Sequence, residues 1–227
     1  GAGRGAAKRG AGIGRGGEDQ QADERAAAPV LIPCGSLVCS TDKLMSATRD
    51  KAQLMSASEI DRTLVRLAHE ILEKTTDLTQ LAFLGIRRRG VPIAQRLGAK
   101  IESLENLKIP VGVLDINLYR DDLSTVGPKP VVSGTQIDFP VTGKDIVLMD
   151  DVLYTGRTIR AALDALFELG RPARVQLLVL IDRGHRELPI EAQYVGRKVP
   201  TSSREIIEVK FAEVDETEKV LLVERIG

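Results

Sequence analysis

The stretch 145–158 places the strongest constraint on the fold, because a strand, a polar loop and a helix start follow one another within it. Four apolar residues, 146–149, predict a strand that is buried on both faces, as in the middle of a parallel sheet. Two carboxylates, Asp150 and Asp151, come directly after it. Beyond the loop, apolar residues recur at helical spacing, at Ile159, Ala162, Leu163 and Leu166. The predicted order is strand, acidic pair, small-residue loop and helix.

This order brings together the groups that a ribose phosphate needs. The first turn of a helix offers unpaired backbone N–H groups and the positive end of the helix dipole, where phosphate binds. Carboxylates accept hydrogen bonds from sugar hydroxyls, and this pair is expected at the carboxyl end of its strand, where open α/β sheets bind ligands. We therefore expect Asp150 and Asp151 to hold a ribose and residues 154–158 to hold its 5-phosphate.

Other interpretations of this stretch fit its residues less well. Receiver domains and some magnesium hydrolases also end a strand on paired acids, but they lack the Thr-Gly-x-Thr loop of residues 155–158. Residues 143–144, Gly-Lys, suggest a Walker loop, yet no earlier glycine has the required spacing. A solvated loop without a ligand remains the alternative.

The stretch resembles the phosphoribosyl pyrophosphate (PRPP) signature of type I phosphoribosyltransferases, in which a strand ends on two acids before a Thr-Gly-rich loop. A second string, DRGHRELPI at 182–190, is similar to members that combine uracil phosphoribosyltransferase activity with attenuation of pyrimidine operons. The similarity runs from about Ser56 to about Arg225. It implies an α/β fold, with a mostly parallel central sheet flanked by helices and a small antiparallel hood.

The resemblance also implies a reaction and its participants. Ribose 5-phosphate would pass from PRPP to uracil, giving UMP and pyrophosphate. Mg²⁺ would be bound through PRPP, without a direct protein ligand. Leader mRNA of a pyrimidine operon is the implied macromolecular partner, and a homodimer or higher homo-oligomer is the implied assembly. A transferase for another base, purine or orotate, and an RNA-binding regulator with little catalysis remain alternatives.

The residues that the resemblance implies fall into four groups. Catalysis is assigned to Asp150, Asp151 and Arg89. PRPP and UMP binding is assigned to Arg88, Arg89, Arg120, Asp150, Asp151, Val152, Leu153, Tyr154, Thr155, Gly156, Arg157 and Thr158. Base binding is assigned to Arg183 and Val195, and RNA binding to Arg66, His69, His185, Arg186, Arg197 and Lys198.

The residue types at 87–90 also support a pyrophosphate-binding turn there. A strand at 81–86 and a helix at 91–105 flank three arginines and Gly90. Cations at a helix N-terminus are unfavourable unless an anion offsets them, so pyrophosphate suits this turn. The related proteins have Thr-Arg-Gly here; Arg88 departs from that pattern and Arg89 keeps it. The polar loop at about 119–134 would be a lid that brings Arg120 to pyrophosphate, or else a surface hairpin.

A helix at about 58–74, with a capping box from Ser58 to Asp61, would present Arg66 and His69 to leader RNA. A solvated polar face is the alternative. Val65 stands where these proteins have threonine, and Glu191 where they prefer arginine. Further strands are predicted at 174–181, 205–211 and 219–223.

Composition adds few constraints. With 32 basic and 32 acidic residues among 227, net charge neither favours nor excludes nucleic acid. No apolar run of membrane-spanning length occurs, so no membrane partner is expected. Cys34 and Cys39 are too few for a zinc site or a disulfide framework, which favours a reducing, cytoplasmic compartment. Residues 1–54 are predicted to be a disordered Gly/Ala/Arg-rich tail, either an extended start or a targeting segment, before a domain at 55–227.

Overall fold

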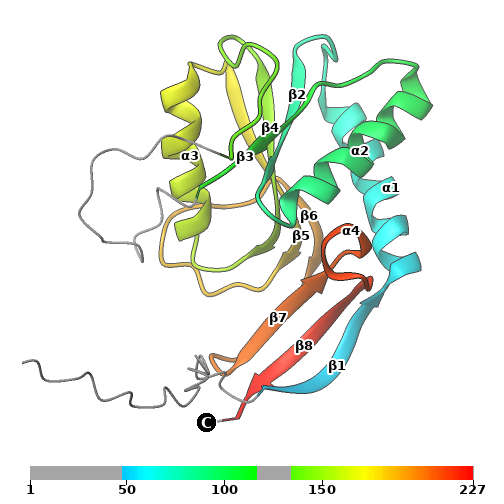
Figure 1. The fold of residues 1–227 in the computed structure, drawn as a ribbon, viewed down its shortest axis with the longest axis vertical. Helices are drawn as coiled ribbons and strands as arrows, with labels where there is room; N and C mark the ends of the chain where they lie inside the picture. The colour runs from blue at the N-terminus through cyan, green and yellow to red at the C-terminus, as the bar shows by residue number, and fades with distance from the viewer. Residues whose placement is uncertain (1–47, 117–133, 227) are drawn as a thin grey trace, which may run out of the picture. The chain divides into compact units, whose positions relative to one another are not determined.

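Strands and helices alternate along much of the computed structural model, which describes residues 48–116 and 134–226. These residues all belong to the unit Lys43–Gly227. Helices lie on both sides of a central sheet, and a smaller sheet lies beyond it (Figure 1). The elements in chain order are β1 (Thr48–Ser56), α1 (Ala57–Lys74), β2 (Leu81–Ile86), α2 (Gly90–Glu105), β3 (Val111–Leu114), β4 (Asp145–Leu153), α3 (Arg157–Leu169), β5 (Arg174–Asp182), β6 (Tyr194–Lys198), β7 (Glu205–Lys210), α4 (Ala212–Asp215) and β8 (Lys219–Arg225).

The central sheet has five parallel strands in the order β3-β2-β4-β5-β6. Leu84 of β2 pairs with Leu148 of β4, and Asp150 of β4 pairs with Val179 of β5. Because the strands are parallel, the segments that follow β2, β4 and β5 leave the sheet at the same edge. The predicted α/β fold is confirmed, and this edge is where its candidate site residues gather.

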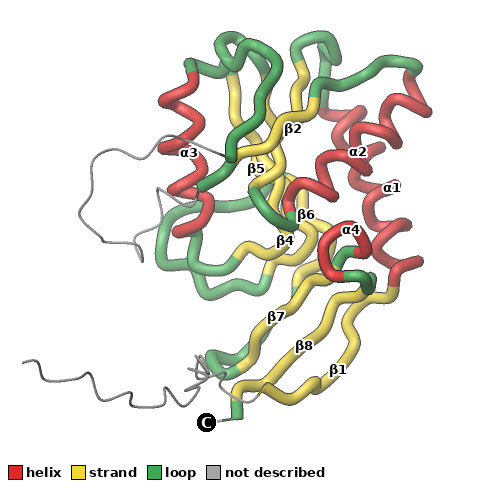
Figure 2. The backbone as a smooth tube through the Cα atoms, in the orientation of Figure 1, coloured by secondary structure: helices red, strands yellow, loops and turns green. Residues whose placement is uncertain are grey.

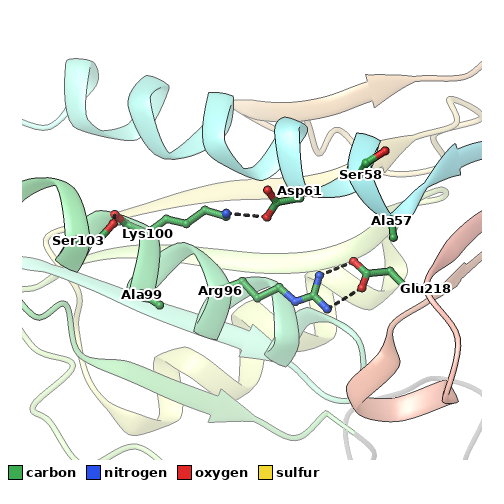
Figure 3. A pocket seen from close by; sticks show the side chains of 8 residues that line it. All are labelled: Ala57, Ser58, Asp61, Arg96, Ala99, Lys100, Ser103 and Glu218. Carbon is green, nitrogen blue, oxygen red and sulfur yellow. Dashed lines mark hydrogen bonds and ion pairs between the residues drawn. The ribbon is translucent and has the colours of Figure 1, made fainter.

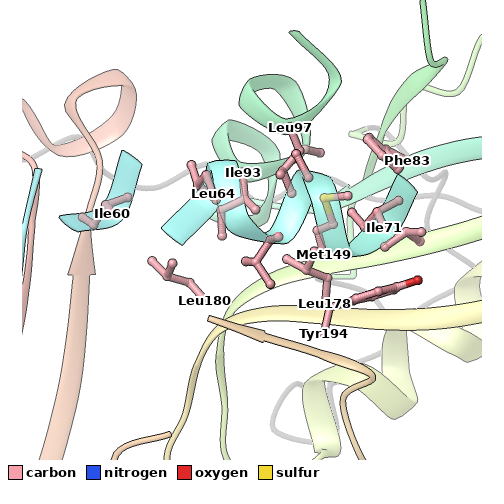
Figure 4. Packing of buried hydrophobic residues seen from close by; sticks show 14 of the residues in the cluster. Ile60, Leu64, Ile71, Phe83, Ile93, Leu97, Met149, Leu178, Leu180 and Tyr194 are labelled. Carbon is pink, nitrogen blue, oxygen red and sulfur yellow. The ribbon is translucent and has the colours of Figure 1, made fainter. Parts of the chain in front are cut away.

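Burial is continuous along the middle of the central strands because helices cover both faces of the sheet, and successive side chains enter opposite faces. Phe83 of β2 packs in the cluster formed with α1 and α2, whereas Leu84 packs in the cluster formed with α3. Figure 4 shows the first cluster, in which Ile71 of α1 and Leu97 of α2 lie near Phe83. These side chains are fully buried. The sheet edge that carries the candidate site is therefore supported by hydrophobic packing on both faces of the sheet.

The hood is an antiparallel sheet in the order β1-β8-β7 (Figure 2). Strands predicted at 205–211 and 219–223 are found as β7 and β8, and α4 lies in the turn between them. Lys51 of β1 forms an ion pair with Glu205 of β7 at 2.5 Å, across the intervening β8. The predicted hood is confirmed, with one strand more than the sequence indicated.

That additional strand corrects the predicted domain boundary. β1 begins at Thr48, so a boundary after residue 54 falls inside a strand. The pairing of β1 with β8 shifts register between Asp50 and Ala52 and again between Gln53 and Met55. These irregularities break the two-residue alternation by which a strand is recognised in a sequence.

Other boundaries also differ from the predictions. The capping interactions of α1 use Ser56 and Glu59, two residues earlier than predicted: the Glu59 carboxylate accepts the Ser56 N–H at 2.8 Å. β4 continues past the acidic pair to Leu153. β6 was not predicted, because five residues with a glycine and two cations carry little strand signal. No helix in the described part of the chain is long and apolar enough to span a membrane.

Candidate active site

Asp150 and Asp151 lie in the last part of β4 and not in the loop that follows it. Asp150 is 7% exposed, and its Oδ1 accepts the N–H of Asp151 at 3.0 Å. Oδ1 of Asp151 accepts the N–H of Val152 at 2.8 Å. Burial raises the pKa of the Asp151 carboxyl, and the positive charge of Arg89 opposes that shift. The strand thus fixes the acidic pair next to a cation from the β2–α2 turn.

The loop after β4 leads directly into the first turn of α3, which begins at Arg157. Gly156 precedes that helix with φ 94°, a left-handed conformation that favours glycine. A Cβ at this position would also lie 3.3 Å from the Cβ of Leu188. The first N–H groups of a helix have no partner within it, so the N–H groups at residues 156–159 suit an anion, whereas the N–H of Arg160 already donates to the carbonyl oxygen of Gly156 at 2.9 Å. The Arg157 side chain pairs with Glu187 at 2.8 Å on the exterior.

The segment 182–190 braces this loop from its carbonyl side. The N–H groups of Glu187 and Leu188 both donate to the carbonyl oxygen of Thr155, at 3.0 and 3.1 Å. Arg186 donates from Nη1 to the carbonyl oxygen of Tyr154 at 2.8 Å and pairs with Asp182 at 2.6 Å. With its carbonyls bound from behind, the loop can present its amides to a ligand.

The β2–α2 turn carries the three arginines beside the acidic pair. Gly90, the first residue of α2, packs against β4 so closely that a Cβ there would overlap the carbonyl oxygen of Met149. The peptide bond between Arg87 and Arg88 is cis. Arg88 is exposed, whereas Arg89 is half-buried. The structure therefore brings the predicted pyrophosphate loop and the acidic pair to one place.

Arg89 has a partner that sequence reasoning missed. Its Nε and Nη2 donate to the two carboxylate oxygens of Asp215 in α4, at 3.0 and 2.7 Å. This pairing lowers the pKa of Asp215 and raises that of Arg89. The only sequence signal was the acidic turn 213–218, to which no function was assigned.

Arg183, predicted to contact the base, is buried at the junction of β5 and the hood. It donates to the carbonyl oxygen of Glu205 at 2.6 Å, and its guanidinium lies 4.0 Å from the ring centroid of Tyr154. Burial lowers its pKa. A hollow beside it is lined by Asp182, Arg183, Gly184, His185, Lys198, Val199, Pro200 and Thr201.

The structure does not bring Val195 into that hollow. The Val195 side chain packs with the α3 cluster, and its carbonyl oxygen accepts Arg66 Nη2 at 3.0 Å. Val199, which the sequence interpretation did not single out, lines the hollow three positions beyond the middle of β6. Residues 198–201, and not Val195, thus lie at the hollow beside Arg183.

The residues predicted to bind RNA lie in three settings. Arg66 and Arg197 line one hollow together with Arg62, and His69 is exposed on the same helix as Arg66. His185 and Lys198 belong to the hollow beside Arg183. Arg186 is directed inward, to the brace of the phosphate loop. The structure places Arg66 and Arg197 at one hollow, and RNA binding by all six residues stays a prediction.

Comparison with known proteins identifies the group to which these features belong. The phosphoribosyl transferase domain family matches residues 53–215. The bifunctional protein PyrR of Pelotomaculum thermopropionicum is 56% identical over 176 residues, which cover 78% of this chain and 97% of that protein. The bifunctional protein PyrR of Thermus thermophilus is 57% identical over 179 residues, covering 79% and 99%. The chain belongs to the PyrR family.

Solved structures agree with the PyrR family's phosphoribosyltransferase fold. A hypoxanthine-guanine phosphoribosyltransferase from Bacillus anthracis superposes with a TM-score of 0.57 at 18% identity, covering 78% of this chain and 99% of that chain. A hypoxanthine phosphoribosyltransferase from Trypanosoma cruzi has a TM-score of 0.61 at 16% identity, covering 77% and 96%. At such identity the likeness concerns the fold alone. Arg120, the remaining predicted ligand of this PyrR-family chain, lies outside the described residues.

Proposed function

We propose that this PyrR-family chain is a uracil phosphoribosyltransferase, which makes UMP and pyrophosphate from uracil and PRPP. The observation that carries the proposal is the convergence at one sheet edge of the acidic pair, the braced loop before α3 and the arginine turn before α2, in a chain up to 59% identical to PyrR proteins. A transferase for purine or orotate is not favoured, because the relatives at 52–59% identity are PyrR proteins, whereas the hypoxanthine enzymes share only 14–18% identity with the chain.

The residues act by positioning and charge. Asp150 and Asp151 accept hydrogen bonds from the ribose hydroxyls and favour the positive charge that develops at C1 in an oxocarbenium-like transition state. Residues 154–158 hold the 5-phosphate at the start of α3. Arg89 neutralises the leaving pyrophosphate. The reaction is accelerated because PRPP and the base are held in a reactive orientation, and no protein nucleophile takes part.

The acidic pair fits Mg²⁺ bound through its substrate. Within residues 48–116 and 134–226, no three His, Cys, Asp or Glu side chains converge into a metal site. Mg²⁺ usually keeps several waters and binds together with substrate phosphates, so it would enter the site on PRPP, with Asp150 and Asp151 facing the ribose hydroxyls. When bound, it would neutralise pyrophosphate charge and make that group leave more easily.

Replacing both acids tests the proposed reaction. Asp150→Asn with Asp151→Asn keeps the shape of the side chains but removes both charges, so we expect a folded protein whose turnover falls by about 10³-fold or more. UMP synthesis from PRPP and uracil measures the effect, and circular dichroism checks the fold. Near-normal synthesis by the double variant would show that the acids have been assigned wrongly.

A second activity is favoured by the family and by one surface. PyrR proteins are named bifunctional, and the hollow lined by Arg62, Arg66 and Arg197 offers cations to a phosphate backbone. We therefore include UMP-responsive binding of pyrimidine-operon leader RNA, and hence transcription attenuation, in the proposed function. RNA binding with and without UMP tests this part. A homo-oligomeric state and a cytoplasmic location stay predictions.

A further inference from the structure

The contact between Arg89 and Asp215 joins the predicted pyrophosphate loop to the hood. The guanidinium uses its Nε and Nη2 edge, with distances of 3.0 and 2.7 Å to the two carboxylate oxygens. Such a side-on pair fixes the plane of the guanidinium as well as its position. Asp215 is itself held, because its Oδ2 also accepts the N–H of Phe211 at 3.1 Å. The geometry leaves the remaining guanidinium nitrogen, Nη1, without an acceptor among the described residues.

The charges around Arg89 explain why it needs such an anchor. Asp151, on β4, attracts the same guanidinium, and Glu208 on β7 adds a weaker attraction. Without Asp215, Arg89 would be free to turn toward the acidic pair that is assigned to the ribose. Asp215 thus competes with Asp151 for the guanidinium of Arg89 and keeps it paired with the hood.

The hood turn does not depend on Arg89 to stay in place. Arg96, two turns further along α2, donates to Glu213 from Nε at 2.8 Å and to Glu218 from Nη2 at 3.1 Å. Figure 3 shows the pairing with Glu218. Phe211, at the start of α4, is fully buried. Because a separate arginine ties the turn to α2, the contact between Arg89 and Asp215 is not required for that purpose.

From this arrangement we propose that Asp215 is the positioning residue of the pyrophosphate site: it orients Arg89 so that Nη1 meets a pyrophosphate oxygen. The inference rests on the proposed function, since it gives Arg89 a role only if pyrophosphate binds there. It extends the site into the hood, where the sequence analysis placed none of the candidate site residues.

Asp215→Asn is the direct test. Asparagine keeps an oxygen for the Phe211 N–H but loses the charge and one acceptor of the pair with Arg89. We expect the KM for PRPP and the inhibition constant for pyrophosphate to rise about tenfold. The Kd for UMP, which carries no pyrophosphate, should stay within about twofold. Asp215→Glu should recover part of the loss, because a carboxylate is restored.

Two further variants separate the possible results. Glu213→Gln removes a partner of Arg96 from the same short helix without touching Arg89, so all three constants should stay within about twofold. Arg89→Gln should reproduce the Asp215→Asn losses, and the double variant should add little to them.

If Arg89→Gln leaves pyrophosphate inhibition unchanged, the assignment of Arg89 in the proposed function fails, and this inference with it. If Arg89→Gln weakens inhibition but Asp215→Asn does not, only the inference fails. An equal loss of UMP affinity in Asp215→Asn and Glu213→Gln would also overturn it, since both would then act through the hood as a whole.

Discussion

Arg186 illustrates how a cation can serve a site without touching its ligand. Its guanidinium donates to the carbonyl oxygens of Tyr154, Gly184 and Ile190 and pairs with Asp182. A guanidinium that is bound on all sides by its own chain cannot reach a phosphate without giving up these contacts. Its effect on a ligand therefore passes through the loop that it holds.

Arg186→Gln should weaken UMP binding without changing how RNA binding depends on salt. The loss of charge-assisted hydrogen bonds is expected to lower the free energy of unfolding by about 1.5–3 kcal/mol and to raise the Kd for UMP several-fold. Calorimetry and thermal unfolding measure both. Because Arg186 makes no phosphate contact in this view, the slope of log K against log salt for RNA stays as in the unchanged protein.

Arg197→Gln is the matched control, since Arg197 lies at the cationic hollow. It should leave UMP affinity unchanged and reduce the salt slope by about one contact. A reduced slope in Arg186→Gln would instead identify Arg186 as a direct RNA contact, in agreement with the sequence prediction.

The acidic pair and the loop after it were predictable because strand, acids, glycine and helix are contiguous in sequence. Contacts between residues that lie far apart in the sequence could not be predicted in this way. Asp215 is separated from Arg89 by 126 positions, and nothing in the acidic turn marks one carboxylate as the partner of a particular cation. The backbone acceptors of Arg183 and Arg186 leave no trace in residue identity either.

At the scale of the elements, strand β1 is held by an ion pair that crosses the hood. Lys51 donates to Glu205 of β7, and the Glu205 carboxylate also accepts the N–H of Ser202 at 2.7 Å. These contacts, that of Lys51 first, lower the pKa of Glu205 from 4.5 to about 2. A carboxyl whose pKa is lowered by folding stabilises the folded state above its ordinary pKa. The contribution disappears as pH falls through the folded-state value.

Lys51→Gln should therefore lower the thermal midpoint at pH 7, and the difference from the unchanged protein should close between about pH 4.5 and about pH 2. Thermal unfolding over this pH series measures the difference. Lys210→Gln is the control, because its ion pair with Glu208 within β7 is longer, at 3.6 Å. A difference that stays constant down to pH 2 would mean that the ion pair with Lys51 does not set the titration of Glu205.

Helices and strands with a regular hydrophobic periodicity were predicted well, and strands with irregular pairing were not. Strand β2 and helix α1 carry continuous apolar patterns, and their predicted positions agree with the structure to within a residue. Strand β1 has two register shifts, and β6 is short and contains Gly196. Such strands are specified by their neighbours in the sheet, which a local pattern does not reveal.

At the scale of the whole molecule, one strand connects the two proposed activities. The carbonyls of Val195 and Gly196, in β6, are bound by Arg66 from the cationic hollow, at 3.0 and 2.7 Å. The same strand ends at Lys198, which lines the hollow beside Arg183. The nucleotide side and the RNA side thus share a strand of five residues.

We expect UMP to strengthen binding of pyrimidine leader RNA, and Arg66→Gln to weaken RNA binding with or without UMP. Gel shifts at several salt concentrations give both affinities, and UMP synthesis should remain near normal in this variant. RNA affinity that is indifferent to UMP would mean that the two activities are not coupled in this chain. Val65 and Glu191, the two departures that the sequence resemblance indicated, are both exposed.

The α/β class, the hood and the shared site edge followed from the sequence and its resemblance, because parallel strands align their carboxyl ends. Strand β1 did not follow, since Thr48–Ser56 lacks a clear pattern.

The placement of Asp150 and Asp151 within the strand ladder has one more consequence. A carboxylate in a loop must be immobilised when its ligand arrives, and that ordering weakens affinity. Here the backbone is already paired with β5 at Asp150 and at Val152, on either side of Asp151. The carboxylate part of the recognition surface is preassembled, so the entropy lost on association falls mainly on the incoming sugar and the surrounding loops.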